Sequence, residues 1–256
     1  MNASNTTAAD SETTEAAATI LAALPTGSRI EQAALADGGD LLLVPARVPE
    51  EHRVFSQLLA WAEQGGSASP PVVLDLYGTL VIWTPRRSAV ITAADRLANA
   101  ATAVSDFAET VAELAVIERA IADAWGDYET DLPQGFAVTT AGPDQLTELS
   151  RRYQRAMSLA GRLARLSPRI HQPPLHPPTL ASQIGERLRD RCRLADREEF
   201  ADDQLETILR LYEASSQQAS DRLLANREHV LTWVIVLLLA AETVLLLVDL
   251  LAAAGG

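Results

Sequence analysis

The stretch that decides the fold of the N-terminal half is VVLDLYGTLVIW, residues 72–83. Val, Leu and Ile dominate on both sides of Tyr77-Gly78, and a short apolar run of such residues is typical of strands. Gly78 permits a tight turn that a Cβ atom would hinder. The stretch therefore predicts one strand or a tight hairpin. After the turn, Val81 and Trp83 lie two residues apart, so both point to the same face, toward a core.

Composition sets the broad class of the protein. The chain has 256 residues, of which 48% are hydrophobic and only 5% aromatic, with Ala and Leu in excess, so we expect mostly helix around a real core. The net charge of −13 argues against a protein that binds duplex nucleic acid. The single cysteine, Cys192, excludes an intrachain disulfide and a cysteine metal cage, and it fits a reducing compartment. Cys192 lies on the apolar face of its expected helix, which favours a small core residue over a nucleophile.

An α+β domain is expected over residues 26–142, after a disordered or weakly helical N-terminus over residues 1–25. Within it, DLLLV at residues 40–44 lies between Gly38-Gly39 and Pro45 and predicts a short buried strand. The other expected elements are a helix over residues 50–64, a loop over 65–71, an Ala-rich helical region over 88–125 and a weak strand over 135–140.

A helical stalk is expected over residues 143–229. Apolar residues recur at three and four over residues 144–166, which predicts an amphipathic helix. The proline-rich residues 167–178 predict a stiff extended linker. One apolar residue per turn predicts a helix over residues 179–197, and Asp202-Asp203 is a candidate N-cap of the next one. These spacings allow two antiparallel helices or one long kinked stalk.

The most apolar part of the chain is VLTWVIVLLLAAETVLLLVDLLAAA, residues 230–254. As a helix it spans roughly 37 Å, more than the ~30 Å of a hydrocarbon core. The 13 Leu, Ile and Val residues of 230–248 favour insertion by about 4 to 8 kcal/mol, and the central carboxylate of Glu242 opposes it by about 2.5 to 3.5 kcal/mol. The segment therefore predicts a C-terminal transmembrane helix with Trp233 near one interface. The alternative is a helix buried in a core or a bundle.

Charges around this segment predict its orientation and its partners. Arg222, Arg227 and His229 precede it and no basic residue follows it, so the positive-inside rule predicts that residues 1–229 stay in the cytoplasm, as in tail-anchored proteins. Glu242 and Asp249 are seven residues apart and share a helix face. In a bilayer this face needs a partner, and self-association through it is our hypothesis.

The opening stretch also matches the first motif of haloacid-dehalogenase-type hydrolases, in which Asp75 would be the nucleophile. Such an enzyme further needs a strand that ends in Ser or Thr, a cation, and a strand that ends in acidic residues. Residues 136–139 and Arg151 are candidates for the first two, but no apolar strand followed by acids is present. We therefore predict no catalytic residue and keep the hydrolase as an alternative.

A cationic face is expected on the helix over residues 144–166 and its exit, because no Asp or Glu occurs from Leu149 to Gly185. It suits lipid headgroups or an acidic partner such as RNA. The alternative is a solvated face that pairs with the acidic helices around residues 198–213. The pair His171 and His176 suggests no third ligand, so we expect loop residues and no metal site. The arginines on one side of the face are Arg151, Arg155, Arg162 and Arg169.

Several short motifs, taken in order, resemble the "required for meiotic nuclear division" family, which includes bacterial YagE-like proteins. The resemblance covers roughly residues 70–250, and Thr232 departs from the family, which has Glu there. It implies an α+β N-terminal domain, a C-terminal helical hairpin and a terminal membrane helix, with no catalytic residues. Eukaryotic relatives are mitochondrial membrane proteins that support organelle translation. The matching positions are Tyr77, Gly78, Val81 and Trp83, the run Leu114-Ala-Val-Ile-Glu118, Arg197, and Leu231-Thr-Trp233 with Glu242.

The sequence thus predicts a non-enzymatic, membrane-anchored scaffold or tether with an α+β domain and a helical stalk. Its expected partners are the lipid bilayer and further copies of itself through the C-terminal helices, with a weaker indication of RNA or ribosome contact. No cofactor and no small-molecule substrate are expected. The first alternative is a soluble helical oligomer that buries the C-terminal helix, and the second is the hydrolase with Asp75.

Overall fold

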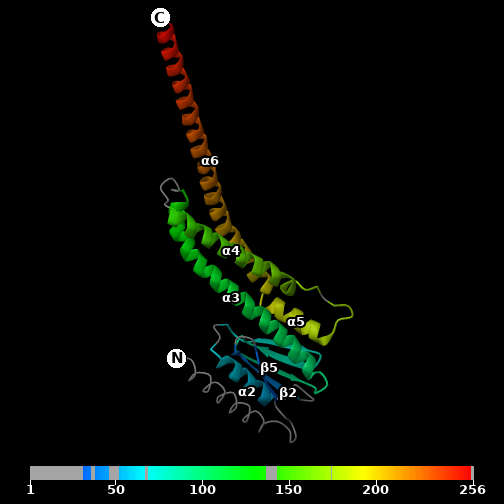
Figure 1. Cartoon of the computed structure of the whole chain (residues 1–256). Helices are drawn as coiled ribbons and strands as arrows, with labels where there is room; N and C mark the ends of the chain where they lie inside the picture. The colour runs from blue at the N-terminus through cyan, green and yellow to red at the C-terminus, as the bar shows by residue number, and fades with distance from the viewer. Residues whose placement is uncertain are drawn as a thin grey trace. The chain divides into compact units, whose positions relative to one another are not determined.

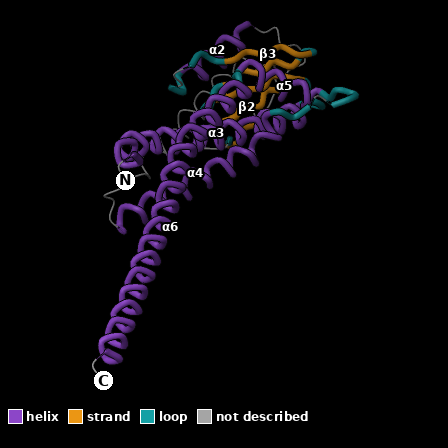
Figure 2. Tube along the Cα trace, turned by 90° about the horizontal axis from the view of Figure 1, so that it is seen from above, coloured by secondary structure: helices purple, strands orange, loops and turns teal. Residues whose placement is uncertain are grey.

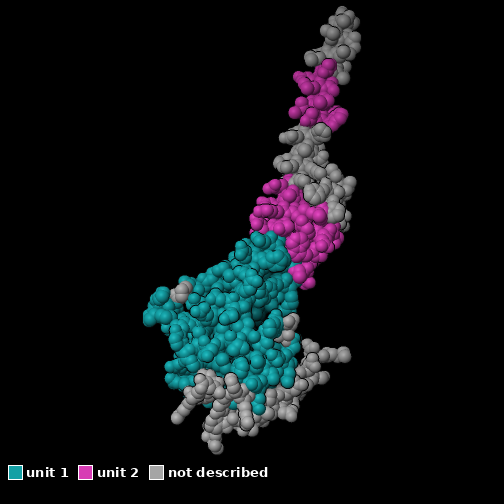
Figure 3. All heavy atoms as spheres, turned by 180° about the vertical axis from the view of Figure 1, so that it is seen from behind, with its two compact units in different colours: residues 1–121, 159–204 teal, residues 122–158, 205–256 magenta. Residues whose placement is uncertain are grey.

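The computed structural model describes residues 31–35, 38–45, 52–66, 69–136, 143–173 and 175–254. Side chains are described for these residues except 52–53, 133–136, 143–146, 216, 218–231 and 244–254. The chain forms two compact units (Figure 3). Unit 1 comprises residues 1–121 and 159–204, and unit 2 comprises residues 122–158 and 205–256.

Unit 1 contains a β-sheet, drawn as arrows in Figure 1 and in orange in Figure 2. The sheet has five strands in the order β1-β2-β5-β4-β3. Only β2 and β5 pair in parallel, and the other neighbours are antiparallel. The strands are β1 (Glu31–Ala34), β2 (Asp40–Pro45), β3 (Val72–Leu76), β4 (Thr79–Trp83) and β5 (Arg87–Thr92).

The stretch 72–83 is a tight hairpin of β3 and β4. Leu76 pairs with Thr79, so only Tyr77 and Gly78 form the loop. Both loop residues have positive φ, 52° for Tyr77 and 75° for Gly78, which is the combination of a type I′ turn. The backbone twist of this turn matches that of the two strands. Glycine suits the second loop position, because it has no Cβ to strain at a positive φ.

Both faces of the sheet are covered. Helix α2 (His52–Glu63) packs its Val54, Leu58 and Trp61 on one face. That face presents Leu42, Val44, Leu80, Ile82, Ala89 and Ile91.

On the opposite face lie Val81 and Trp83, which are 0% and 3% exposed. The Trp83 ring meets Phe107 of helix α3 edge to face, with centroids 4.8 Å apart. The prediction that Val81 and Trp83 point into a core is therefore confirmed.

Long helices follow the sheet, so the expected α+β class with a mainly helical C-terminal part is confirmed (Figure 2). Helices α3, α4 and α6 each contribute residues to both units. A break at Cys192-Arg193, where Arg193 has a φ of 51°, separates α5 from α6. The helices are α3 (Leu97–Phe136), α4 (Pro143–Ile170), α5 (Leu180–Arg191) and α6 (Leu194–Ala254).

Several expected elements are confirmed and others need correction. The strand over 40–44 and the helices over 50–64 and 144–166 are present as β2, α2 and α4. Residues 88–92 are not helical but form β5, whose burial on both faces removes the alternation that marks a strand. The expected strand over 135–140 is wrong at its start, where α3 continues to Phe136, and its remainder lies outside the described residues, as do residues 1–30. Helix α4 continues to Ile170, so the linker begins later than expected, and α6 begins at Leu194 instead of at Asp202-Asp203.

The expected transmembrane helix over residues 230–254 is corrected. Among the described residues, none of the helices combines the length and the apolar character needed to cross a bilayer. The apolar run of α6 whose side chains are described, Trp233–Ala241, covers about 14 Å before Glu242 interrupts it, against a core of ~30 Å. The expected single-pass membrane localisation, with residues 1–229 in the cytoplasm, is corrected with it. Trp233, Glu242 and Asp249 therefore lose their expected membrane roles.

Substitution of Gly78 tests the hairpin turn, and substitution of Gly161 in α4 is the control. Gly78→Ala is expected to destabilise the protein by about 1 to 2 kcal/mol, because an L-residue is strained at a φ of 75°. Gly161→Ala, at an exposed position of α4 with open space around it, is expected to stabilise by about 0.5 to 1 kcal/mol. Urea unfolding followed by circular dichroism measures both changes. An equal response of the two variants contradicts the turn.

Candidate functional site

The most unusual surface of the chain is the apolar segment of α6, Trp233–Leu239. All seven side chains of this segment are exposed, from 46% for Val234 to 66% for Leu237. Successive residues of a helix point about 100° apart, so the exposed side chains cover the whole circumference of α6. The described neighbours up to Thr243 are exposed as well. In the part of the chain that the structure describes, no residue buries this segment.

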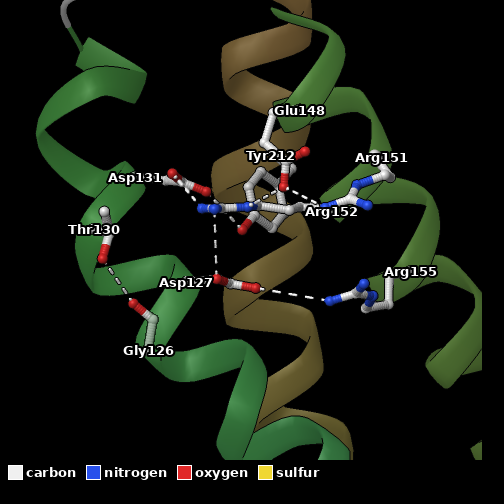
Figure 4. Close-up of polar contacts among 9 residues, drawn as sticks. All are labelled: Gly126, Asp127, Thr130, Asp131, Glu148, Arg151, Arg152, Arg155 and Tyr212. Atoms are coloured by element: carbon white, nitrogen blue, oxygen red, sulfur yellow. Dashed lines mark hydrogen bonds and ion pairs between the residues drawn. The ribbon is translucent and has the colours of Figure 1, made fainter. Parts of the chain in front are cut away.

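The helices of unit 2 are joined by a second feature, a buried polar cluster that we call the clamp (Figure 4). At its centre is Asp131 of α3, only 4% exposed. Arg152 of α4 donates from Nη1 to Asp131 Oδ1 at 2.7 Å. The hydroxyl of Tyr212 in α6 donates to the other carboxylate oxygen, Oδ2, at 3.1 Å. One carboxylate therefore ties three helices together.

Further charges surround Arg152 in the clamp. Its Nε donates to Glu148 Oε1 at 3.0 Å, and its Nη2 lies 3.6 Å from Asp127 Oδ1. Hydrogen bonds from Arg151 and Arg152 lower the pKa of Glu148. The hydrogen bond to Asp131 raises the pKa of Arg152 although burial opposes it. Burial, followed by the charge of Asp131, raises the pKa of Tyr212, so the phenol stays neutral.

The clamp is suited to holding helices in register. Both oxygens of Asp131 accept hydrogen bonds from protein groups, and Arg152 compensates the buried charge. Leu205, Ile208 and Tyr212 are buried on α6 beside it, so the same helix turns supply apolar packing. The clamp therefore fixes the part of α6 from which the apolar segment extends.

The structure places the expected arginine face among acidic partners. Arg151 pairs with Glu148 at 2.9 Å and Arg155 lies 4.0 Å from Asp127, both within unit 2. In unit 1, Arg169 lies 3.2 Å from Glu109 and 3.8 Å from Glu113. Arg162 is half-buried and forms no ion pair with the described acids. The acids that pair come from α3 and α4 instead of residues 198–213, and the binding of an anionic partner stays a prediction.

Two positions quoted for the family resemblance meet in unit 1. Arg197 donates to both carboxylate oxygens of Glu118, at 2.9 and 2.7 Å, and both side chains are 34% exposed. This two-point pairing joins α3 to the first turn of α6. Cys192 lies close by, and burial raises the pKa of its thiol to about 11 although Arg197 opposes this. The thiol is therefore neutral near pH 7.

The other candidate residues stay apart from these clusters. Asp75 is exposed on β3, at the edge of the sheet, opposite Leu80 in an antiparallel pair. The parallel sheet that the hydrolase hypothesis needs is limited to β2 and β5. His171 contacts Glu198 at 3.1 Å and His176 is exposed. Among the described residues no three His, Cys, Asp or Glu side chains are grouped to hold a metal ion.

No protein-family model, no curated protein and no solved structure matches this chain. The resemblance to the "required for meiotic nuclear division" family therefore stays a prediction.

The clamp was not found from the sequence. Its residues carry a weak signal, because Asp127 and Asp131 are four apart, as are Glu148 and Arg152, so each pair shares one helix face. The sequence does not show that these faces meet, nor that Tyr212 joins them from a position 81 residues after Asp131.

Removing one partner of the clamp is expected to cost much more than removing its exposed neighbour. Arg152→Met leaves the buried charge of Asp131 without compensation and should destabilise by about 3 to 5 kcal/mol. Arg151→Met, a matched control on the surface of the same helix, should change the free energy of unfolding little. The double variant Asp131→Asn with Arg152→Met should recover part of the loss. Chemical unfolding measures all three, and equal losses for the two arginine variants contradict the clamp.

The pH dependence of the alkylation rate of Cys192 tests the burial of its thiol. Because its pKa is raised to about 11, the thiolate fraction and the alkylation rate should still rise between pH 9 and pH 11. In urea the same thiol should approach its plateau near pH 9. Iodoacetamide labelling followed by mass spectrometry measures both profiles. Coincident profiles for the folded and the unfolded chain contradict the burial of the thiol.

Proposed function

We propose that the chain is a non-enzymatic scaffold that assembles with further copies of itself by burying the apolar segment of α6. The observation that carries this proposal is the exposure of all seven side chains of Trp233–Leu239 around the helix. A contiguous apolar surface of this kind marks an interaction site in a folded protein. Among the described residues no helix is long and apolar enough to cross a bilayer, and the partner that we propose for this surface is a protein.

Geometry explains why unit 2 does not cover the segment itself. Tyr212, at the clamp, and Trp233 are about 32 Å apart along α6. Helix α3 ends only about 8 Å after Asp131, and α4 begins only about 14 Å before Arg152. Neither helix is long enough to reach the segment, so its partner must come from outside unit 2.

A second copy of the chain suits this surface best. An identical helix presents the same apolar length, and symmetric association buries both segments at once. Burying the exposed half of seven large side chains contributes about 5 to 10 kcal/mol per chain. Association costs a similar amount in lost freedom. Because the segment is apolar all round, a bundle of several copies, in which each helix has two or more neighbours, buries more of it than a pair.

Acidic residues predict which side of α6 faces water in such a bundle. Glu242 and Asp249 share one face of the helix in the sequence. In the absence of a bilayer this face is best solvated, because burying like charges is costly. Trp233 and Leu237 lie on the opposite side of the helix and are the expected centre of the contact.

Paired substitutions at that centre test the assembly. Trp233→Glu with Leu237→Glu is expected to convert an assembled species into the single chain, because two buried carboxylates oppose packing. Phe200→Glu is the control, since Phe200 is 65% exposed on the same helix but far from the segment. Sedimentation velocity over a range of concentrations measures the size of each variant.

The native chain and the Phe200 variant should sediment as oligomers at concentrations where the double variant is monomeric. Circular dichroism checks that all three keep their helix content. A native chain that is monomeric at the highest concentration, or a double variant of native size, overturns the proposal.

A further inference from the structure

Unit 1 contains a cleft of about 680 Å³ that we call the arginine cleft. Its walls come from the chain on both sides of the β3–β4 hairpin, from α3 and from the junction of α5 and α6. The volume lies in the range of small-molecule sites. A smaller cavity of about 280 Å³ in the same unit includes Asp106 in its wall and has no such concentration of one charge.

The wall of the cleft carries an excess of positively charged residues. Arg86, Arg191, Arg193 and Arg197 line it, and no Asp or Glu does. Arg193 and Arg197 are compensated, by Asp196 at 2.6 Å and by Glu118 at 2.7 Å. Arg86 and Arg191 are exposed and form no ion pair with the described acids. Two arginines without an ion pair to the described acids thus line one cleft in a chain of net charge −13.

These two arginines stand on fixed backbone. The carbonyl of Arg86 accepts a hydrogen bond from the amide of Asp40 at 2.8 Å. A Cβ on the adjacent Gly39 would lie 2.9 Å from the same carbonyl oxygen, so the two segments touch closely. Arg191 is the last residue of α5, and the next amide, of Cys192, donates to Leu188 at 2.9 Å. The backbone from which each of the two side chains extends is therefore fixed.

The remainder of the cleft is apolar. Val72 and Pro85 line it, together with Ala112 and Ala115 of α3, whose small side chains leave the space open. An inorganic anion would leave this apolar surface in contact with water. A ligand that fills the cleft therefore combines an oxyanion with an apolar body.

We propose that the arginine cleft binds a small molecule that carries a phosphate or carboxylate group on an apolar body. The oxyanion accepts hydrogen bonds from Arg86 and Arg191, whose planar guanidinium groups match its geometry. The apolar body packs on Val72, Ala112 and Ala115, which are partly exposed in the wall. This proposal departs from the expectation of no small-molecule substrate, and it is independent of the apolar segment of α6, which belongs to unit 2.

Calorimetry with 1-naphthyl phosphate, inorganic phosphate and 1-naphthol tests the oxyanion contact and the apolar contact separately and together. The naphthyl phosphate should bind at least about tenfold more tightly than either other compound, since only it uses both parts of the cleft. Arg86→Ser with Arg191→Ser should weaken its binding about tenfold or more. The matched control is Arg187→Ser with Arg165→Ser, two exposed arginines outside the cleft wall that carry the same change of charge.

The thiol of Cys192, which lines the cleft, reports where the probe sits. Bound 1-naphthyl phosphate should slow the alkylation of Cys192 in the native chain and in the control variant, but not in the double variant of Arg86 and Arg191. Absence of binding, equal affinity of the two double variants, or unchanged alkylation overturns the proposal. Binding that disappears only in the Trp233 and Leu237 variant places the probe on α6 and overturns it as well.

Discussion

The burial of strands β4 and β5 along their whole length is the constraint on which the rest of unit 1 depends. A strand buried on both faces carries apolar side chains on both, so the sheet needs a helical layer on each side. Helix α2 provides the first layer from the neighbouring sequence. The second layer comes from α3, through Phe107 against Trp83, and from α5, which packs on β3. The chain reaches α5 only after α3 and α4, so the sheet is completed by residues about 100 positions later in the sequence.

Polar pairs then fix the helices that this arrangement brings together. Glu118 and Arg197 join α3 to α6 in unit 1, and the clamp of Asp131, Arg152 and Tyr212 joins α3, α4 and α6 in unit 2. These pairs contribute less net stability than apolar packing of the same volume, but a buried charge that loses its partner is costly. They therefore favour one register of the long helices over others. The apolar segment of α6 differs from these pairs, because its seven side chains are exposed and no described residue buries them.

Much of the sheet could be predicted from local sequence. The turn at Tyr77-Gly78, the inward positions of Val81 and Trp83, the strand around Leu41–Val44 and the helix over His52–Glu63 all follow from residue type and period. Strand β5 was missed because burial on both faces gives it no alternation, although Val90, Ile91 and Thr92 carry the β-branched signal. The predicted start of α6 was wrong, because the helix break depends on a positive φ at Arg193. Arginine is not a residue type that indicates a positive φ.

The sequence by itself determined the tight turn at Tyr77-Gly78, the inward positions of Val81 and Trp83 and the helical character of the C-terminal part, because each depends on contacts within a few residues. It also showed the apolar run in α6, but the membrane role drawn from that run was wrong. Only the tertiary structure decided that Asp131 meets Arg152 and Tyr212, that Glu118 meets Arg197, and that Arg86 shares a cleft with Arg191. Each of these meetings joins residues far apart in the chain. The distances between these side chains depend on how the helices pack. The spacing of residues along one helix or strand does not predict that packing.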